Sequence, residues 1–184
     1  MTNFVVMKPE NKSPYRRGAE FGFFFGAIFT LMFFSSIYLL MHPILGVIPT
    51  LLTIGCPILL YFFLRKCYVA DNGETTYFSL VATGISSFFC GGFICGLIAM
   101  FHISLFAPNA ISKWVTDMVQ MYRDIKEPAA QDMADKLQSL IDLGLLPSPA
   151  EMGINIIWTA LTAGIILSAI LAFVATIKKV NNRQ

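Results

Sequence analysis

The stretch GAEFGFFFGAIFTLMFFSSIYLLM, residues Gly18–Met41, decides the fold of this chain. It has 24 residues, Glu20 is its one charged residue, and Arg16 and Arg17 come directly before it. As a helix that rises about 1.5 Å per residue it would be roughly 36 Å long, enough to cross a hydrocarbon core of about 30 Å. A helix that is apolar on every side lies in lipid or in the centre of a large protein, and a chain of 184 residues is not large. The stretch therefore predicts a transmembrane helix.

Three more apolar runs follow, and the composition agrees with a membrane protein. Hydrophobic residues make up 56% of the chain and charged residues 13%, whereas charged residues are about a quarter of an ordinary soluble domain. Only His42, Pro43 and Ile44 separate the first two runs, which predicts a tight antiparallel hairpin. We expect a single membrane domain over residues 1–184, with transmembrane helices at about 18–41, 45–64, 77–104 and 153–177.

The segment 107–150 differs in character, because charged residues return and apolar residues recur at helical spacing. One apolar stripe begins at Ile111 and ends before Pro128, and a second begins at Ala130 and is closed by Gly144 as a C-cap. Both predicted helices are amphipathic, and neither is apolar enough to span. The expected fold is an all-α, four-helix transmembrane bundle with an extracytoplasmic amphipathic helical hairpin, which lies either on the bilayer or across the mouth of the bundle.

The distribution of lysine and arginine predicts the orientation of the chain. With both termini inside, nine of the 13 basic residues lie on the cytoplasmic side and four on the outer side. The net charge is then +5 inside and −3 outside, in agreement with +2 for the whole chain. We therefore expect a multi-pass protein of the bacterial inner membrane, with both termini cytoplasmic.

Glycines recur on two of the apolar runs at the spacing of close helix contacts. Gly18, Gly22 and Gly26 are four residues apart on the first run. On the third run, the glycines that share or flank one face are Gly84, Gly91, Gly92 and Gly96. Lipid supplies no hydrophobic drive between helices, so small residues that let two backbones approach closely mark helix-packing faces. We interpret both sets as packing faces within the chain, with a homodimer interface as the alternative.

A few polar residues inside the apolar runs are candidates for a pathway or an ion pair. Glu20 is the one acid in a run, and Arg16 lies four residues before it, which favours an interfacial ion pair over proton or cation coupling. His102 lies at the outer end of the third run, on its small-residue face. Asn155 begins a stripe with Thr159, Thr162 and Thr176 that could line a polar cavity, although such hydroxyls more often bond their own backbone.

Motifs of catalysis, cofactor binding and metal binding are absent from the sequence. It has no Gly-x-Ser-x-Gly elbow, no phosphate-binding loop and no His-Glu-x-x-His. The four cysteines lack metal-finger spacing, so we interpret them as packing residues that form no disulfide. His42 and His102 are expected on different faces of their helices, which disfavours a shared metal. We expect no catalytic residue, no cofactor, no metal and no nucleic-acid partner.

The layout of the chain resembles a known family. The residues that carry the resemblance are Tyr15-Arg16-Arg17-Gly18 and Gly22-Phe23-Phe24-Phe25-Gly26, followed by a proline-bearing second helix, a small-residue third and an amphipathic external stretch. In these features, from about Arg16 to Lys179, the chain is similar to an uncharacterised four-helix family of Bacteroidetes inner-membrane proteins that carries a domain-of-unknown-function label. The resemblance implies the fold and the compartment, and brings no activity and no site residues.

These features predict a non-enzymatic membrane protein that serves as an interaction or assembly subunit. Its expected contacts are the lipid bilayer and a protein partner or a second copy, bound through the glycine faces and the external hairpin. The hairpin surface is acidic, which favours protein over anionic lipid as its partner. The alternative is a small transporter that uses Glu20 and the polar faces of helices three and four.

Overall fold

The computed structural model describes residues 13–38 and 46–177, and in that part of the chain it contains six helices and no strand. Four of the helices are long and apolar enough to cross a membrane. The bounds of the six helices are α1 Pro14–Ile37, α2 Val47–Ala70, α3 Tyr77–Phe106, α4 Ala110–Asp124, α5 Pro128–Asp142 and α6 Pro149–Ile177. The predicted all-α bundle with four helices long enough to span is confirmed. The expected hairpin turn between α1 and α2, including His42, lies outside the described residues.

Several helix boundaries differ from the predicted ones, and at three of them, the start of α1, the end of α2 and the start of α6, the structure shows a local feature at the new boundary. α1 begins four residues earlier, because Pro14 occupies its first turn and the Ser13 hydroxyl caps it by accepting from the Arg16 amide at 3.3 Å. α2 continues to Ala70 instead of ending at residue 64, and Cys67 in the added turns is buried. α6 begins at Pro149, because Ser148 and Glu151 form a reciprocal capping box.

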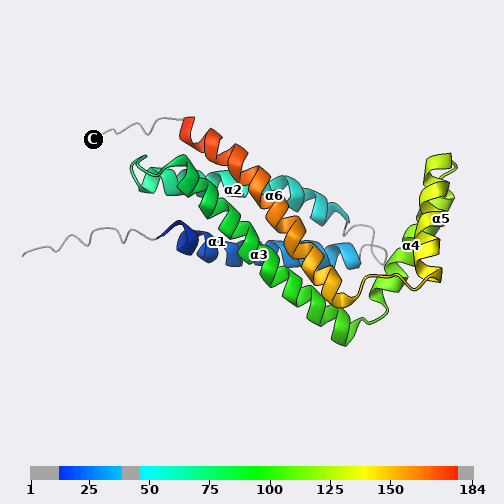
Figure 1. Ribbon diagram of the computed structural model, residues 1–184. Coiled ribbons are helices and arrows are strands. Elements are labelled where there is room, and N and C mark those ends of the chain that lie inside the picture. Colours follow the sequence, from blue (N-terminus) through cyan, green and yellow to red (C-terminus); the bar gives the residue numbers. More distant parts are fainter. Residues whose placement is uncertain (1–12, 39–45, 178–184) are drawn as a thin grey trace, which may run out of the picture.

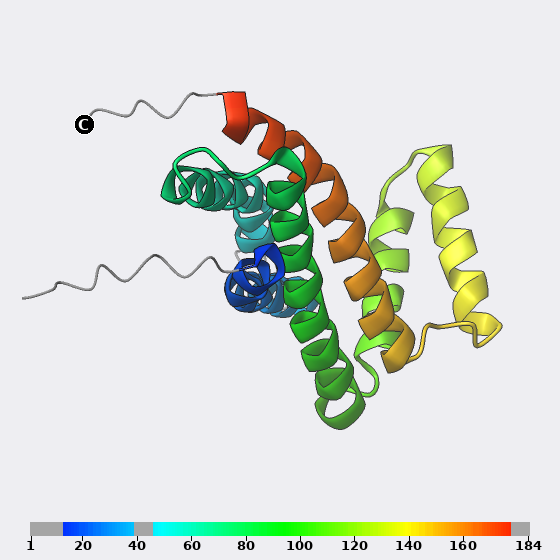
Figure 2. The same ribbon diagram turned by 60° about the vertical axis from the view of Figure 1, so that its left-hand side comes forward.

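α3 is the central helix of the bundle, with α1 against one side and α6 against another (Figures 1 and 2). The α1 side is a seam of small residues in which backbones approach closely. A Cβ added at Gly22 would lie 2.5 Å from the Cβ of Cys90, and one added at Gly91 would lie 2.9 Å from the Cβ of Phe25. Contacts this short are not tolerated by real side chains, so glycine is required at these positions for the observed separation of α1 and α3.

The contact between α3 and α6 is also a close approach of backbones at small residues. Gly84 faces Ser168, Gly92 faces Ala160, and Gly96 faces the backbone of Gly153. A Cβ on Gly96 would lie 2.7 Å from the Gly153 carbonyl oxygen. Because two faces of α3 are used in this way, the seven glycines singled out in the sequence lie against helices of the same chain.

α2 lies at the edge of the bundle and packs on α6 and, more narrowly, on α1. Phe63 of α2 stacks on Phe21 of α1 with ring centroids 3.7 Å apart. At the other contact the Arg65 guanidinium donates to the Ala175 carbonyl oxygen at 2.8 Å. That carbonyl is in the last turn of α6, where helix carbonyls lack partners and a cation is favourable.

The α4–α5 hairpin lies across the end of the bundle where α3 ends and α6 begins (Figure 1). Ile111 and Val115 of α4 pack on Ile103 of α3, with Leu137 and Ile141 of α5 against the same cluster. Gly144 has φ +65° and ends α5, as predicted, and the Leu145 amide donates to the Leu140 carbonyl at 2.9 Å. Of the two predicted positions, lipid surface or bundle mouth, the structure places the hairpin over the mouth.

The seam between α1 and α3 can be tested with one pair of Gly→Ala variants. Gly22→Ala should lower the stability of the purified protein by about 1–3 kcal/mol, because the new methyl group meets Cys90 and the Ser87 carbonyl. Gly55→Ala is the matched control, since no atom lies within 4 Å of its Cβ and the substitution improves helix propensity. The measurement is thermal unfolding in one detergent, and equal melting temperatures for the two variants would contradict the close contact.

Candidate functional site

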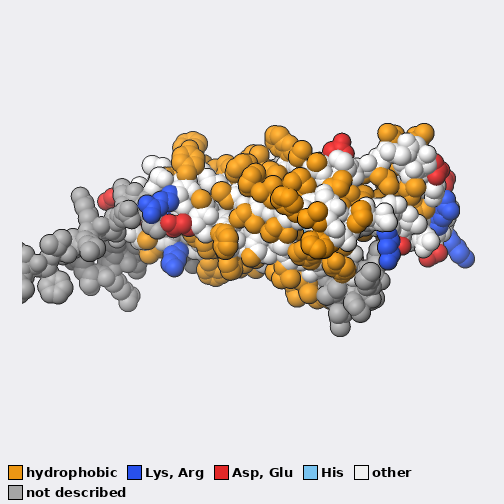
Figure 3. Space-filling view, turned by 90° about the horizontal axis from the view of Figure 1, so that it is seen from below, with side chains coloured by type: hydrophobic (Ala, Val, Ile, Leu, Met, Phe, Trp, Pro, Cys, Tyr) orange, Lys and Arg blue, Asp and Glu red, His pale blue; other side chains and the backbone are white. Residues whose placement is uncertain are grey.

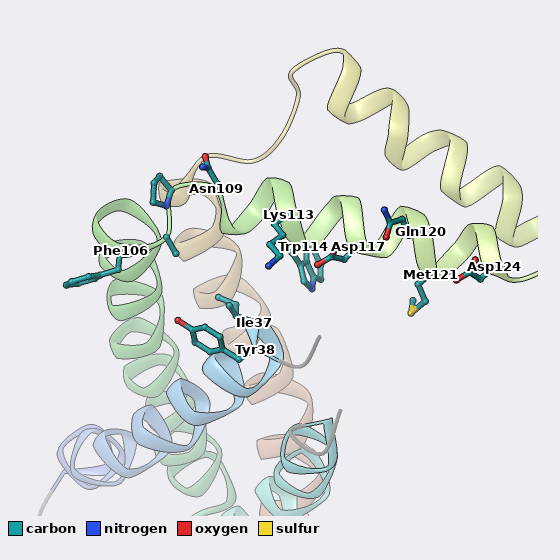
Figure 4. Close-up of a pocket in the computed structure, with 12 residues that line it drawn as sticks. Ile37, Tyr38, Phe106, Asn109, Lys113, Trp114, Asp117, Gln120, Met121 and Asp124 are labelled. Carbon is teal, nitrogen blue, oxygen red and sulfur yellow. The ribbon is translucent and has the colours of Figure 1, made fainter. Parts of the chain in front are cut away.

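A groove of about 770 Å³ lies beneath α4. Its floor is the end of α1, with Ile37 and Tyr38, and one wall is the end of α3, with Phe106. The opposite wall is α4, and its Trp114 and Met121 side chains point into the groove (Figure 4). The groove is therefore bounded by both the membrane bundle and the hairpin, and it exists only because the two are docked together.

The side of α4 that lines the groove has a mixed character. Trp114 and Met121 are seven residues apart, so they share one side of the helix, and 41% and 49% of their surface is exposed. Lys113, Asp117 and Asp124 line the groove among them (Figure 4). A partly exposed aromatic and a thioether interleaved with charges are suited to binding a complementary protein surface.

His102 borders this end of the bundle but does not line the groove. Its Nε2 lies 3.3 Å from the Tyr38 hydroxyl, and its ring meets Phe34 edge-on with centroids 4.8 Å apart. The imidazole is thus fixed between α1 and α3 by one hydrogen bond and aromatic contacts. Its predicted position on the packed face of the third helix agrees with these contacts.

The interior of the bundle between the described helices is filled mostly by apolar side chains. Phe25, Leu60, Leu64 and Phe88 are buried in one cluster between the helices. Of the buried hydroxyls, Ser87 donates to the carbonyl oxygen of Thr83 four residues before it, which satisfies the hydroxyl within its own helix. The buried hydroxyl of Ser168, on α6, has no hydrogen-bond partner among the described residues.

Of the two options for the Asn155 stripe, the structure agrees with hydroxyls that bond their own backbone and not with the lining of a polar cavity. Asn155, Thr159 and Thr162 are exposed on the outer side of α6, and the Thr162 hydroxyl donates to the Trp158 carbonyl at 2.9 Å. α6 instead turns its smallest residues inward, namely Gly153, Ala160, Gly164, Ser168, Ala172 and Ala175. Close packing on α3 selected the face by side-chain volume, and the threonines could turn outward because their hydroxyls bond their own backbone.

Glu20 and Arg16 lie at the opposite end of the bundle from Asn155 and His102. The Arg16 Nε is 3.6 Å from the Glu20 carboxylate, and both side chains are more than half exposed. This is the interfacial ion pair that the four-residue spacing predicts. The four residues proposed for a pathway are therefore divided between the two ends of the bundle.

A second ion pair, which the sequence analysis missed, ties α1 to the turn after α2. Arg17 donates two hydrogen bonds to Asp71, of 2.5 and 2.8 Å, and their side chains are only 18% and 24% exposed. Thr75 also donates to the Asp71 carboxylate. Asp71 begins a turn in which φ is 54° at Asn72 and 80° at Gly73. The sequence did offer one signal for this pair, because it predicts that Arg17 and Asp71 lie at the same membrane surface.

The surroundings of Asp71 hold its carboxyl group in the charged form. The hydrogen bonds from Arg17 lower the pKa of Asp71, partial burial opposes them, and Thr75 adds to the lowering. A bidentate guanidinium–carboxylate pair is geometrically specific as well as strong. It fixes the start of α1 against the α2–α3 turn.

Comparison with known proteins identifies the family. Residues 20–176 match the family described as "Protein of unknown function (DUF4199)". The chain belongs to this family. The match covers all four helices that could cross a membrane and the hairpin between α3 and α6. Comparison with curated proteins and with solved structures gave no match.

The Arg17–Asp71 pair predicts a loss of stability in acid. A carboxyl whose pKa is lowered by folding contributes stability that is complete above its unfolded pKa of about 3.9 and is lost as the pH falls through the folded value. Asp71→Asn should be less stable than wild type at pH 7 by on the order of 1–3 kcal/mol, and the difference should shrink as the pH falls below about 4.

Asp132→Asn is the matched control for this experiment. Asp132 pairs with Lys136 at 2.6 Å, but the two side chains are 65% and 68% exposed, so solvent screens the pair. Thermal unfolding of both variants should be followed between pH 3 and about pH 7. A difference between wild type and Asp71→Asn that stays constant over this range would show that the pair does not hold the two helices.

Proposed function

We propose that this member of the family is a multi-pass protein of the bacterial inner membrane with both termini in the cytoplasm. The distribution of charge supports this orientation. Arg16, Arg17, Arg65 and Lys66 gather at the end of the bundle that holds the α2–α3 turn, and the acidic hairpin lies at the other end. Figure 3 shows the charged side chains at the two ends and a broad apolar band between them. Lysine and arginine are retained on the cytoplasmic side of membranes.

The orientation predicts the activity of alkaline phosphatase fusions, because the enzyme folds only on the outer side of the membrane. A fusion at the C-terminus should be inactive, and an insertion near Glu127, in the turn between α4 and α5, should be active. Phosphatase activity is measured by colony staining and by an assay normalised to the amount of fusion protein. The reverse pattern would show that the proposed orientation is wrong and that the hairpin lies in the cytoplasm.

For its role we propose a non-enzymatic interaction or assembly subunit that binds a protein partner at the groove under α4. The observation that supports this role is the packing of an amphipathic hairpin against Ile103 at the bundle mouth, with Trp114 and Met121 left partly exposed beside it. A concave surface with partly exposed aromatic and methionine side chains is suited to binding a protein partner.

The charge of the hairpin indicates the chemistry of the partner surface. With four basic and seven acidic residues in the segment between α3 and α6 and in the first turn of α6, this end carries a net charge of −3. Such a surface repels anionic lipid headgroups and attracts a basic segment of a protein. The proposed partner surface is therefore a cationic extracytoplasmic region of another protein, since a second copy would present the same acidic hairpin.

The small transporter is the weaker alternative, because no described contact favours it. Its proposed residues, Glu20 and Asn155, lie at opposite ends of the bundle, and Asn155 is exposed on the outer face of α6. Uptake or efflux by protein reconstituted in vesicles would establish transport, and it would do so independently of any partner bound to the hairpin.

Site-specific photocrosslinking in native membranes tests the partner site. A photoreactive phenylalanine analogue at Met121 should give a discrete adduct, and its yield should fall at high salt because charge attraction contributes to the encounter. The matched control is the same analogue at Ile54, which is exposed on α2 and lies away from the groove. If position 121 gives only monomer, or the same products as position 54, the partner site is not at this groove.

A further inference from the structure

A second groove of about 560 Å³ lies between α1 and α2, at the cation-rich end of the bundle. Its apolar lining includes Phe21 of α1 and Leu59, Phe62 and Phe63 of α2. Its polar end is formed by Arg17 and Lys66. Because both helices are long and apolar enough to cross a membrane, the groove opens on the space that lipid occupies.

The apolar part of this groove is long enough for the first part of an acyl chain. The stacked rings of Phe21 and Phe63, 3.7 Å apart, join α1 to α2 beside it. From Lys66 inward to Leu59 the lining on α2 covers a length of roughly 10 Å, at about 1.5 Å per residue. Half of a hydrocarbon core is about 15 Å thick, so the groove can hold about two thirds of that depth of one acyl chain.

The charges at its polar end favour an anion. Arg17 is held in place by its two hydrogen bonds to Asp71, and the guanidinium has further N–H groups that can donate to a ligand. Lys66 is exposed, and no carboxylate forms an ion pair with it among the residues 13–38 and 46–177. The groove therefore ends in one fixed guanidinium, already paired, and one ammonium group that is available to a ligand.

We propose that this groove is a binding site for one anionic glycerophospholipid of the cytoplasmic leaflet. The lipid phosphate contacts Lys66 and the guanidinium of Arg17, and an acyl chain lies along Phe21, Leu59 and Phe62. A basic recess between membrane helices on the cytoplasmic side is a recurrent form of site for anionic lipid headgroups. A zwitterionic headgroup fits less well, because its ammonium would be placed among like charges.

This site is independent of the partner groove under α4, which is at the other end of the bundle. It requires that α1 and α2 cross the membrane, and it does not require a protein partner at the hairpin. The limited packing of α2 on α1 leaves the space open, and a bound lipid would fill it and join the two helices.

Native mass spectrometry of the purified protein tests the site. Protein released from micelles that contain equal amounts of phosphatidylglycerol and phosphatidylethanolamine with identical chains should retain one phosphatidylglycerol, several-fold more often than phosphatidylethanolamine. Lys66→Gln should reduce this preference about fivefold, since that is the contribution of one cation near an anionic headgroup. Lys136→Gln, an exposed lysine on the hairpin, should leave the preference unchanged.

A second pair of variants separates the groove from general charge attraction. Leu59→Trp fills the groove without changing its charge and should abolish the retained phosphatidylglycerol, whereas Ile58→Trp, on the neighbouring exposed position, should retain it. Unfolding temperatures establish that both variants fold. Inorganic phosphate in excess should not displace the lipid, because the acyl chain contributes to binding. Equal retention of the two lipids by wild type, equal retention by the two tryptophan variants, or displacement by phosphate would overturn the proposal.

Discussion

The close approach of α3 to its neighbours is the constraint on which the rest of the structure depends. In lipid, apolar surface gains nothing by leaving one apolar environment for another, so helices associate through short-range packing and interhelical polar contacts. Gly22 against Cys90 and Gly96 against Gly153 bring backbones to distances that any side chain would prevent. Through these contacts α3 is the common neighbour of α1 and α6, whereas α2 lies at the edge of the bundle.

Because of this packing, the charged side chains lie at the two ends of the bundle. With the interior filled by Phe25, Phe88 and small residues, a charged group has no solvated position at mid-depth. At one end Arg17 and Asp71 pair between α1 and the α2–α3 turn, and Arg65 of α2 binds a terminal carbonyl of α6. At the other end the hairpin covers the mouth. The bundle is thus closely packed between the described helices and has two chemically different ends.

The two grooves arise where this packing is incomplete. Under α4, Ile111 and Val115 pack on Ile103, whereas Trp114 and Met121, which line the groove on the same helix, stay partly exposed. Between α1 and α2, no glycine seam closes the space, and the contact rests on Phe21 with Phe63 and on the Arg17–Asp71 pair. One groove has an acidic margin and the other a basic one, which is why different ligands are proposed for them.

The sequence by itself determined the four apolar helices, the amphipathic pair and the glycine seams, because each follows from local composition and from the 3.6-residue period. It also determined the Arg16–Glu20 pair, whose partners are one helical turn apart. Only the tertiary structure decided that α6 turns Ser168 and Ala172 inward and Asn155 outward, since two faces of α6 carry small or polar residues and the choice depends on fit against α3. The Arg17–Asp71 pair and both grooves also required the fold. They join residues far apart in the chain, and no local pattern specifies which helices become neighbours.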